Sequence, residues 1–90
     1  MKQKTLEELR TEIDRINHDI LLLLEKRIQA AQKIGALKRK GGADISDPQR
    51  EQEVLTQVKK LASEHHLDTS FVESLFEYIM AYTKQKELEE

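Results

Sequence analysis

Residues 6–27 read LEELRTEIDRINHDILLLLEKR, and this stretch decides the fold. Its apolar residues recur at alternating spacings of three and four, which is the heptad period of an amphipathic helix. The pattern continues past Arg27, and no glycine or proline interrupts it before Gly35. The apolar seam consists of Leu6, Leu9, Ile13, Ile16, Ile20, Leu23, Ala30, Ile34 and Leu37. The spacing therefore predicts one long amphipathic helix over residues 5–39.

The two ends of this helix carry their own signals. Thr5 is a good N-cap, and Glu8 three residues later completes the pattern of a capping box. The pair Gly41-Gly42 allows a left-handed C-cap. About 35 residues span roughly 52 Å as a helix, whereas a globule of this size has a radius of gyration of about 12 Å. We therefore expect the far end to pack on a second copy of the chain.

A short loop and a second helix follow the long one. Residues 40–46 read as the loop, and Asp47-Pro48 is typical of an N-cap followed by proline in the first helical turn. The second helix is predicted over residues 48–65. Its single apolar stripe consists of Val54, Leu55, Val58, Leu61 and Ala62.

A turn at residues 67–70 separates this helix from a third, for which Asp68 or Ser70 is the expected N-cap. The apolar face of the third helix consists of Phe71, Val72, Leu75, Phe76, Ile79 and Met80. These elements predict an all-α fold with three helices, the first very long, in a single helical domain over residues 1–90.

Composition excludes several classes of function. Basic and acidic residues, 15 and 17 of them, are interspersed, so the chain lacks the concentrated basic face of a nucleic-acid-binding protein. Cysteine is absent, which excludes disulfides and thiolate chemistry. No apolar run approaches the ~18 residues of a membrane span, and the N-terminus has no signal-peptide core. We therefore expect a cytoplasmic protein without a membrane or nucleic-acid partner.

Three polar residues interrupt the apolar stripes: Arg27, Thr83 and Glu87. An unpaired buried charge costs several kcal/mol, so each of them needs a partner or a ligand. For Arg27 the simplest explanation is an ion pair with a nearby carboxylate, or a side chain that extends to solvent at a helix junction.

Neighbouring cations favour a ligand instead. Lys38 follows Arg27 by eleven residues, about three turns on and only ~20° around the helix axis. Arg50, in the first turn of the second helix, adds a third cation at the positive end of that helix. Such a cluster suits a small ligand with two anionic groups. Arg10 lies roughly 25 Å from Arg27 along the axis, so it would reach such a site only from an antiparallel partner.

Other chemistries lack their residues. His18, His65 and His66 have no ligand partners at metal-binding spacing. The sequence contains neither a glycine-rich phosphate loop after a strand nor a nucleophile elbow.

These features together resemble the AroQ-type, all-helical chorismate mutases, from Leu6 to about Leu88. The segments that carry the resemblance are LEELRTEIDRINHDILLLLEKR, IGALK, DPQRE and HHLDTSFVESLFEYIMAYTKQKE. Its specificity comes from a combination: an arginine near the start, one in the middle of the seam, a lysine eleven residues later, and D-P-x-R-E opening the next helix.

The resemblance implies an intertwined antiparallel homodimer with two equivalent sites. It also implies the Claisen rearrangement of chorismate to prephenate, in the route to Phe and Tyr, without a cofactor. Arg10 of the partner subunit, Arg27 and Arg50 would bind the two carboxylates of the substrate. Lys38 would donate to the ether oxygen of the breaking C–O bond.

The remaining site residues carry over in the same way. Asp47 and Glu51 would lie by the ring hydroxyl of the substrate, and Thr83 stands where relatives often have serine. Glu87 stands where many bacterial relatives have a glutamine that donates a second hydrogen bond to the ether oxygen. An ionised carboxylate cannot donate, so we predict that protonated Glu87 is the active form. Lys38, Glu87 and Arg27 are thus the expected catalytic residues.

Four alternatives stay open. An isochorismate pyruvate lyase would share the helices and arginines, but such lyases tend to lack the acidic pair Asp47 and Glu51. An aminodeoxychorismate mutase would differ only in the ring substituent near Glu51. A non-catalytic dimerisation module would explain the seam but not the polar cluster. A regulatory domain of a larger, fused enzyme is the fourth.

Overall fold

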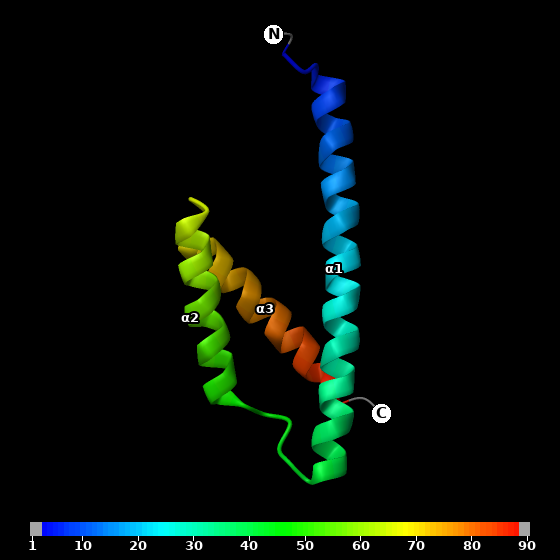
Figure 1. The fold of residues 1–90 in the computed structure, drawn as a ribbon, viewed down its shortest axis with the longest axis vertical. Coiled ribbons are helices and arrows are strands. Elements are labelled where there is room, and N and C mark those ends of the chain that lie inside the picture. The colour runs from blue at the N-terminus through cyan, green and yellow to red at the C-terminus, as the bar shows by residue number, and fades with distance from the viewer. Residues whose placement is uncertain (1–2, 89–90) are drawn as a thin grey trace. The chain divides into compact units, whose positions relative to one another are not determined.

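The computed structural model describes residues 3–88, which form three helices and no strand. Helix α1 runs Leu6–Gly41, α2 runs Pro48–Glu64 and α3 runs Thr69–Leu88 (Figure 1). The all-α class and the very long first helix are thereby confirmed. The first helix extends two residues beyond its predicted end at 39, because Gly41 still has a helical backbone. The chain divides into two compact units, Met1–Ala30 and Ala31–Glu90.

Both ends of α1 have the expected caps. Thr5 Oγ1 accepts a hydrogen bond from the Glu8 amide (3.1 Å), and the Glu8 carboxylate accepts one from the Thr5 amide (3.1 Å). This reciprocal pair is a capping box. At the other end Gly42 has a φ of +72°, and the Ala43 amide donates to the Lys38 carbonyl (2.8 Å). The left-handed glycine thus ends the helix as predicted.

In the first unit, the apolar seam of α1 is exposed to solvent. Its large seam residues are all exposed, from 45% for Ile16 to 64% for Leu23. The exposed members are Leu6, Leu9, Ile13, Ile16, Ile20 and Leu23. A contiguous stripe of this kind is unusual on the surface of a monomeric protein and marks an interaction surface.

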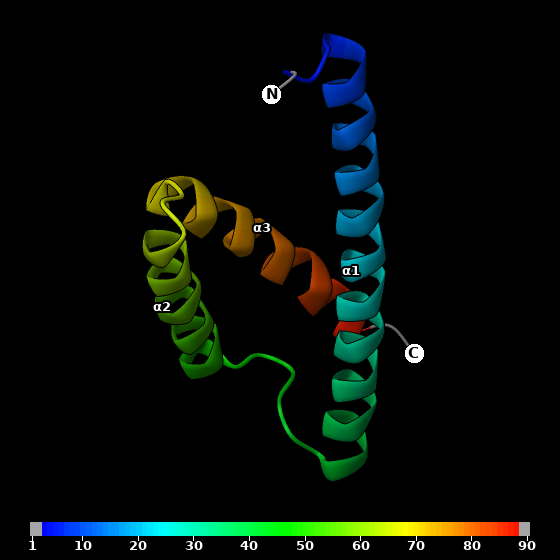
Figure 2. The same ribbon diagram turned by 45° about the horizontal axis from the view of Figure 1, so that its top comes forward.

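In the second unit, α2 packs on α3 (Figures 1 and 2). Ala62 and Val72 are buried, and the half-buried apolar residues of α2 and α3 are Val54, Leu55, Val58, Phe76, Ile79 and Met80. An ion pair between Lys59 and Glu73 (2.9 Å) joins the two helices at the surface. The described core is thin, as the low content of aromatic residues predicts.

The caps of α2 and α3 follow the sequence signals. Asp47 is the N-cap of α2, and its carboxylate accepts from the Arg50 amide (3.1 Å). Of the two candidates for α3, Asp68 provides the cap: its carboxylate accepts from the Phe71 amide (3.0 Å). Pro48 occupies the first helical turn of α2, where its missing amide hydrogen costs nothing.

Within residues 3–88, no helix combines the length and the apolar character that crossing a lipid bilayer requires.

The turn from α2 to α3 contains a strained residue. His66 has a φ of 57°, in the left-handed region that side chains with a Cβ disfavour. The His66 amide donates to the Ser63 carbonyl (3.2 Å) and the Leu67 amide to the Ala62 carbonyl (2.8 Å). This pair of bonds is a Schellman motif, in which glycine is the usual left-handed residue.

Replacing His66 with glycine should therefore raise the free energy of unfolding. We expect a gain of about 0.5–1 kcal/mol, because relief of the left-handed strain exceeds the added entropy of the unfolded chain. The measurement is the urea midpoint at fixed protein concentration, with an unchanged slope. His65→Gly is the matched control: its φ is −100°, so glycine relieves nothing there. A lower midpoint for His66→Gly than for wild type would contradict the prediction.

Candidate functional site

The predicted site residues belong to both units. The first unit contains Arg10 and Arg27, and the second contains Lys38, Asp47, Arg50, Glu51, Thr83 and Glu87. In the second unit, polar contacts connect the end of α1, the loop 42–47, the start of α2 and the end of α3. The predicted residues of that unit lie on or beside these contacts.

One face of α1 in the second unit consists of two small residues and a lysine. Ala31 and Gly35 are buried and Lys38 is half-buried, at spacings of four and three that place them on one side of the helix. Ile34 and Leu37, the seam residues of the same turns, are 45% and 70% exposed. The face that packs inside the second unit is therefore distinct from the predicted apolar seam.

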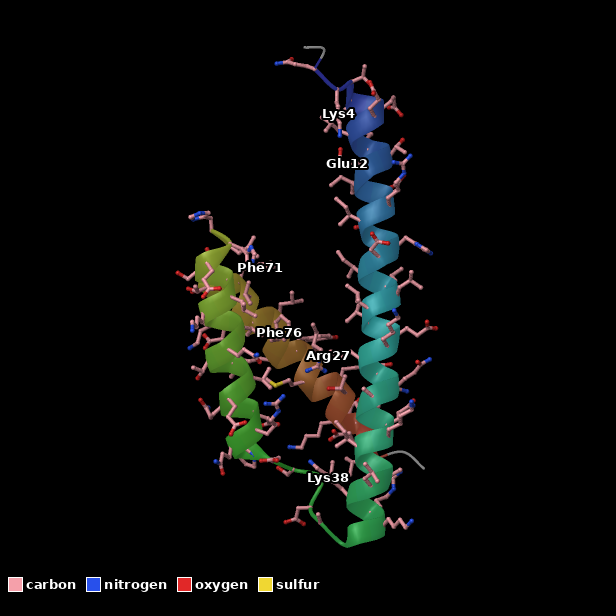
Figure 3. The ribbon with its side chains drawn as sticks, in the orientation of Figure 1. Lys4, Glu12, Arg27, Lys38, Phe71 and Phe76 are labelled. Atoms are coloured by element: carbon pink, nitrogen blue, oxygen red, sulfur yellow. The ribbon has the colours of Figure 1, made fainter. Side chains whose placement is uncertain are left out.

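Lys38 is held at this face by the loop. Its Nζ donates to the Ile45 carbonyl (3.1 Å), and Figure 3 shows the side chain near the end of α1, beside the segment that leads to α2. An ammonium group that donates to a backbone carbonyl has a restricted position. The ammonium group is therefore held beside the loop that leads to α2.

The end of α3 touches α1 at Gly35. A Cβ added to Gly35 would lie 2.8 Å from the Glu87 Cα and 3.0 Å from its carbonyl carbon, and closer still to the carbonyl oxygen. Arg39 donates a hydrogen bond from Nη1 to the same carbonyl oxygen. Glu87 thus reaches α1 through its backbone, beside the turn that carries Lys38.

The start of α2 holds three of the predicted residues. The Asp47 carboxylate is already engaged as a helix cap. The Arg50 guanidinium pairs with Glu53 (3.3 Å) and its side chain is 63% exposed, so this contact is a weak surface ion pair. Glu51 lies 3.9 Å from Lys84 Nζ on α3.

Lys84 also donates to Ser46 Oγ in the loop (3.2 Å). It therefore links the loop, α2 and α3, a role that we did not predict. The sequence signal was weak, because a lysine next to Thr83 resembles any solvent-facing residue on that helix.

Thr83 is 6% exposed, and its hydroxyl lies 3.0 Å from the Ile79 carbonyl and 3.2 Å from the Met80 carbonyl of its own helix. Such bonds to carbonyls three or four residues back satisfy a buried hydroxyl without any ligand. The position of Thr83 in the apolar stripe is therefore compatible with the fold alone. A role in ligand binding remains a prediction.

The first unit carries exposed ion pairs near its start. Arg10 pairs with Glu7 (3.1 Å) on the surface of α1. Lys4 contacts Glu12 (2.6 Å), as Figure 3 shows, and its ammonium holds the pKa of the Glu12 carboxyl below the ordinary value. A surface pair such as Arg10–Glu7 contributes little to stability, so Arg10 is easily recruited by a stronger anion. The convergence of Arg10 and Arg27 with the residues of the second unit stays a prediction.

In the described part of the chain, no group of three or more His, Asp or Glu side chains could hold a metal ion.

Comparison with known proteins identifies the family of this chain. A family model described as chorismate mutase type II matches residues 9–88. The chain is 34% identical over 79 residues to a chorismate mutase of Methanocaldococcus jannaschii, covering 88% of this chain and 80% of that protein. It is 29% identical over 79 residues to a 4-amino-4-deoxychorismate mutase of Streptomyces venezuelae, covering 88% and 77%.

The solved structure of a conserved hypothetical protein from Pyrococcus furiosus superposes with a TM-score of 0.74 at 36% sequence identity. This match covers 96% of the present chain and 99% of the other. The resemblance drawn from the sequence motifs is thus confirmed over nearly the whole chain, and the chain belongs to the type II chorismate mutase family.

Proposed function

We propose that this chain is a chorismate mutase that converts chorismate to prephenate by Claisen rearrangement, in the route to Phe and Tyr. The observation that carries the proposal is the family match over residues 9–88, a span that includes every predicted site residue. A single domain over residues 1–90 stays a prediction from the sequence. The reaction is pericyclic and needs neither a nucleophile nor a cofactor, so binding geometry and electrostatics supply the catalysis.

Binding is the task of the arginines. Arg27, Arg50 and Arg10 of the partner subunit hold the two carboxylates of the flexible dianion in the reactive chair conformation. Guanidinium groups suit this task because their planar donors match carboxylates in pairs. Fixing the chair in advance removes orientational entropy from the barrier. The exposed Arg50 side chain and the weak surface pair of Arg10 support this assignment, since both are available to a stronger anion.

Electrostatic stabilisation is the task of Lys38 and Glu87. Negative charge develops on the ether oxygen as the C–O bond breaks, and the Lys38 ammonium donates to it. Protonated Glu87 donates a second hydrogen bond to the same atom. Two contacts support this pairing. The Lys38 ammonium is held by the Ile45 carbonyl of the loop, and the turn of α1 that carries Lys38 lies next to Glu87 at the end of α3.

Asp47 and Glu51 lie by the ring hydroxyl of the substrate, and Thr83 borders the same site. Support comes from the start of α2, where the Asp47 cap and the Glu51–Lys84 contact give both carboxylates restricted positions. A carboxylate accepts a hydrogen bond from a hydroxyl without moving a proton, which suits recognition.

The 29% identity with a 4-amino-4-deoxychorismate mutase favours one further candidate substrate. This candidate substrate, 4-amino-4-deoxychorismate, carries an amino group in place of the ring hydroxyl of chorismate. Offering both compounds separately in the same assay distinguishes the two activities through their kcat/KM ratio.

The working unit is a homodimer in which the exposed seam of α1 packs on the same seam of a second copy, antiparallel to it. The six large exposed residues of that seam support this assembly. A cytoplasmic location stays a prediction from the sequence.

The function is tested by following the absorbance of chorismate with the purified chain and identifying prephenate as the product. Wild type should turn over, and Arg27→Ala should lose at least about a hundredfold in kcat/KM with the dimer intact, because a carboxylate clamp is missing. The matched control is Lys26→Ala, which removes the same charge from the neighbouring position of α1. Absence of prephenate with folded wild type would overturn the proposed function, and full activity of Arg27→Ala would overturn the site assignment.

Mixing two inactive variants tests whether Arg10 acts across chains. Arg10→Ala and Arg27→Ala chains, unfolded together and refolded at equal concentration, form heterodimers in which one site carries both changes and the other carries neither. Random pairing therefore restores about a quarter of wild-type activity. Each variant refolded alone is the control. Activity that stays at the level of the separate variants would show that Arg10 serves its own chain or no site at all.

The pH dependence of kcat tests the role of Glu87. The protonated carboxyl donates to the ether oxygen and the ionised one repels the developing charge, so kcat of wild type should fall as rising pH removes this proton. Glu87→Gln donates at every pH and should flatten the profile. Circular dichroism across the same pH range shows whether the fold persists. An equal decline in both proteins would assign the titration to another group.

A further inference from the structure

We propose that Gly35 and Arg39 are positioning residues that fix the last turn of α3, and with it the side chain of Glu87, against the turn of α1 that carries Lys38. The inference rests on the proposed function, in which Lys38 and Glu87 act on the same ether oxygen. It adds two residues that need no contact with the substrate. Both act on the backbone of Glu87 rather than on its carboxyl group.

Gly35 sets how closely α3 approaches. An added Cβ would lie 2.8 Å from the Glu87 Cα and 3.0 Å from its carbonyl carbon, inside the distance that real Cβ atoms keep. The obstructing atoms are backbone, so no side chain can rotate away to make room. Any side chain at position 35 must therefore push the end of α3 outward or bend it.

Arg39 holds the end of α3 in that position. It follows Gly35 by four residues and so lies on the same face of α1, where its Nη1 donates to the Glu87 carbonyl. Glu87 lies in the last turn of α3, where carbonyls lack an intrahelical donor and carry the partial negative charge of the helix end. A guanidinium group satisfies this carbonyl and complements its charge. One residue thus permits the approach, and the other maintains it.

The same two turns of α1 also place the first cation. Lys38 lies between Gly35 and Arg39, and its Nζ is anchored at the Ile45 carbonyl. The distance between the two groups that act on the ether oxygen is therefore set locally, by residues 35–39 and the backbone of Glu87. Catalytic hydrogen bonds are sensitive to displacements of about 1 Å, which can reduce rates about a hundredfold.

The first test is Gly35→Ala, with Gly41→Ala as its matched control. Both are helical glycines of α1, but a Cβ on Gly41 meets nothing within 4 Å. We expect kcat of Gly35→Ala to fall about 10- to 100-fold, with a smaller change in KM because the carboxylate clamps stay in place. Gly41→Ala should retain wild-type kinetics. A Gly35→Ala enzyme with more than half of the wild-type kcat would overturn the proposal.

Arg39→Ala provides a second reading if Gly35→Ala fails to fold, because it leaves the backbone contact in place. We expect a lower kcat at similar KM, partly restored in Arg39→Lys, which keeps a cationic donor at the same position. Lys40→Ala is the charge-matched control from the same helical turn and should behave as wild type. Equal kinetics for the Ala, Lys and wild-type forms at position 39 would remove Arg39 from the proposal.

A double-mutant cycle separates positioning from general stability. If Gly35 acts through Glu87, then Gly35→Ala should lower kcat far less in a Glu87→Ala background than in wild type. The same fold-loss in both backgrounds would indicate a merely structural role and would overturn the inference. Turnover of chorismate by wild type reports on the proposed function separately, since the inference is read only from ratios between variants.

Discussion

The long helix α1 has an apolar seam that the first unit does not cover, and the proposed assembly follows from that constraint. The helix has 36 residues, or about 54 Å of length. Its exposed seam residues would each contribute up to about 1.5–3 kcal/mol if fully buried, so covering them adds several kcal/mol to the stability of an assembly. Ninety residues with a thin internal core have few other sources of stability. Assembly and folding are therefore closely coupled in the proposed dimer.

The same helix serves a second purpose with a different set of residues. Beside the large apolar seam residues Ile34 and Leu37 runs the face formed by Ala31, Gly35 and Lys38, where small side chains admit α3 and one lysine brings charge. Large residues on one face favour association, and small residues on the next permit a close crossing. This division places Lys38, the proposed catalytic cation, next to the proposed assembly surface without using the surface itself.

Local signals account for the parts of the fold that were predicted. The capping box of Thr5 and Glu8, the Asp47-Pro48 start and the Gly41-Gly42 end are determined by residues within one helical turn, and each took the expected form. The extension of α1 through Lys40 and Gly41 was missed, because a glycine pair can end a helix at either member. The choice of Asp68 over Ser70 depended on backbone geometry that composition does not specify.

Contacts between distant segments account for what was missed at the candidate site. Six of the eight predicted residues lie on or beside the polar contacts of the second unit, since their helices were identified correctly. The roles of Arg39 and Lys84 depend on the path of α3, because each touches a residue 38 or more positions away. Heptad and stripe patterns describe which face of a helix is buried, but not where another helix crosses it. Arg10 and Arg27 were placed by sequence spacing alone, and their part in the site stays a prediction.

Gly35 also affects how this protein should respond to selection. A glycine inside a helix is about 1 kcal/mol less favourable than alanine, but a Cβ at position 35 would lie 2.8 Å from the Glu87 Cα. The gain in helix propensity at this position is therefore opposed by the loss of the close contact with α3. At Gly41 a Cβ would meet nothing within 4 Å, so the same substitution keeps the gain without that loss. A library selected for heat resistance should therefore replace Gly41 while it retains Gly35.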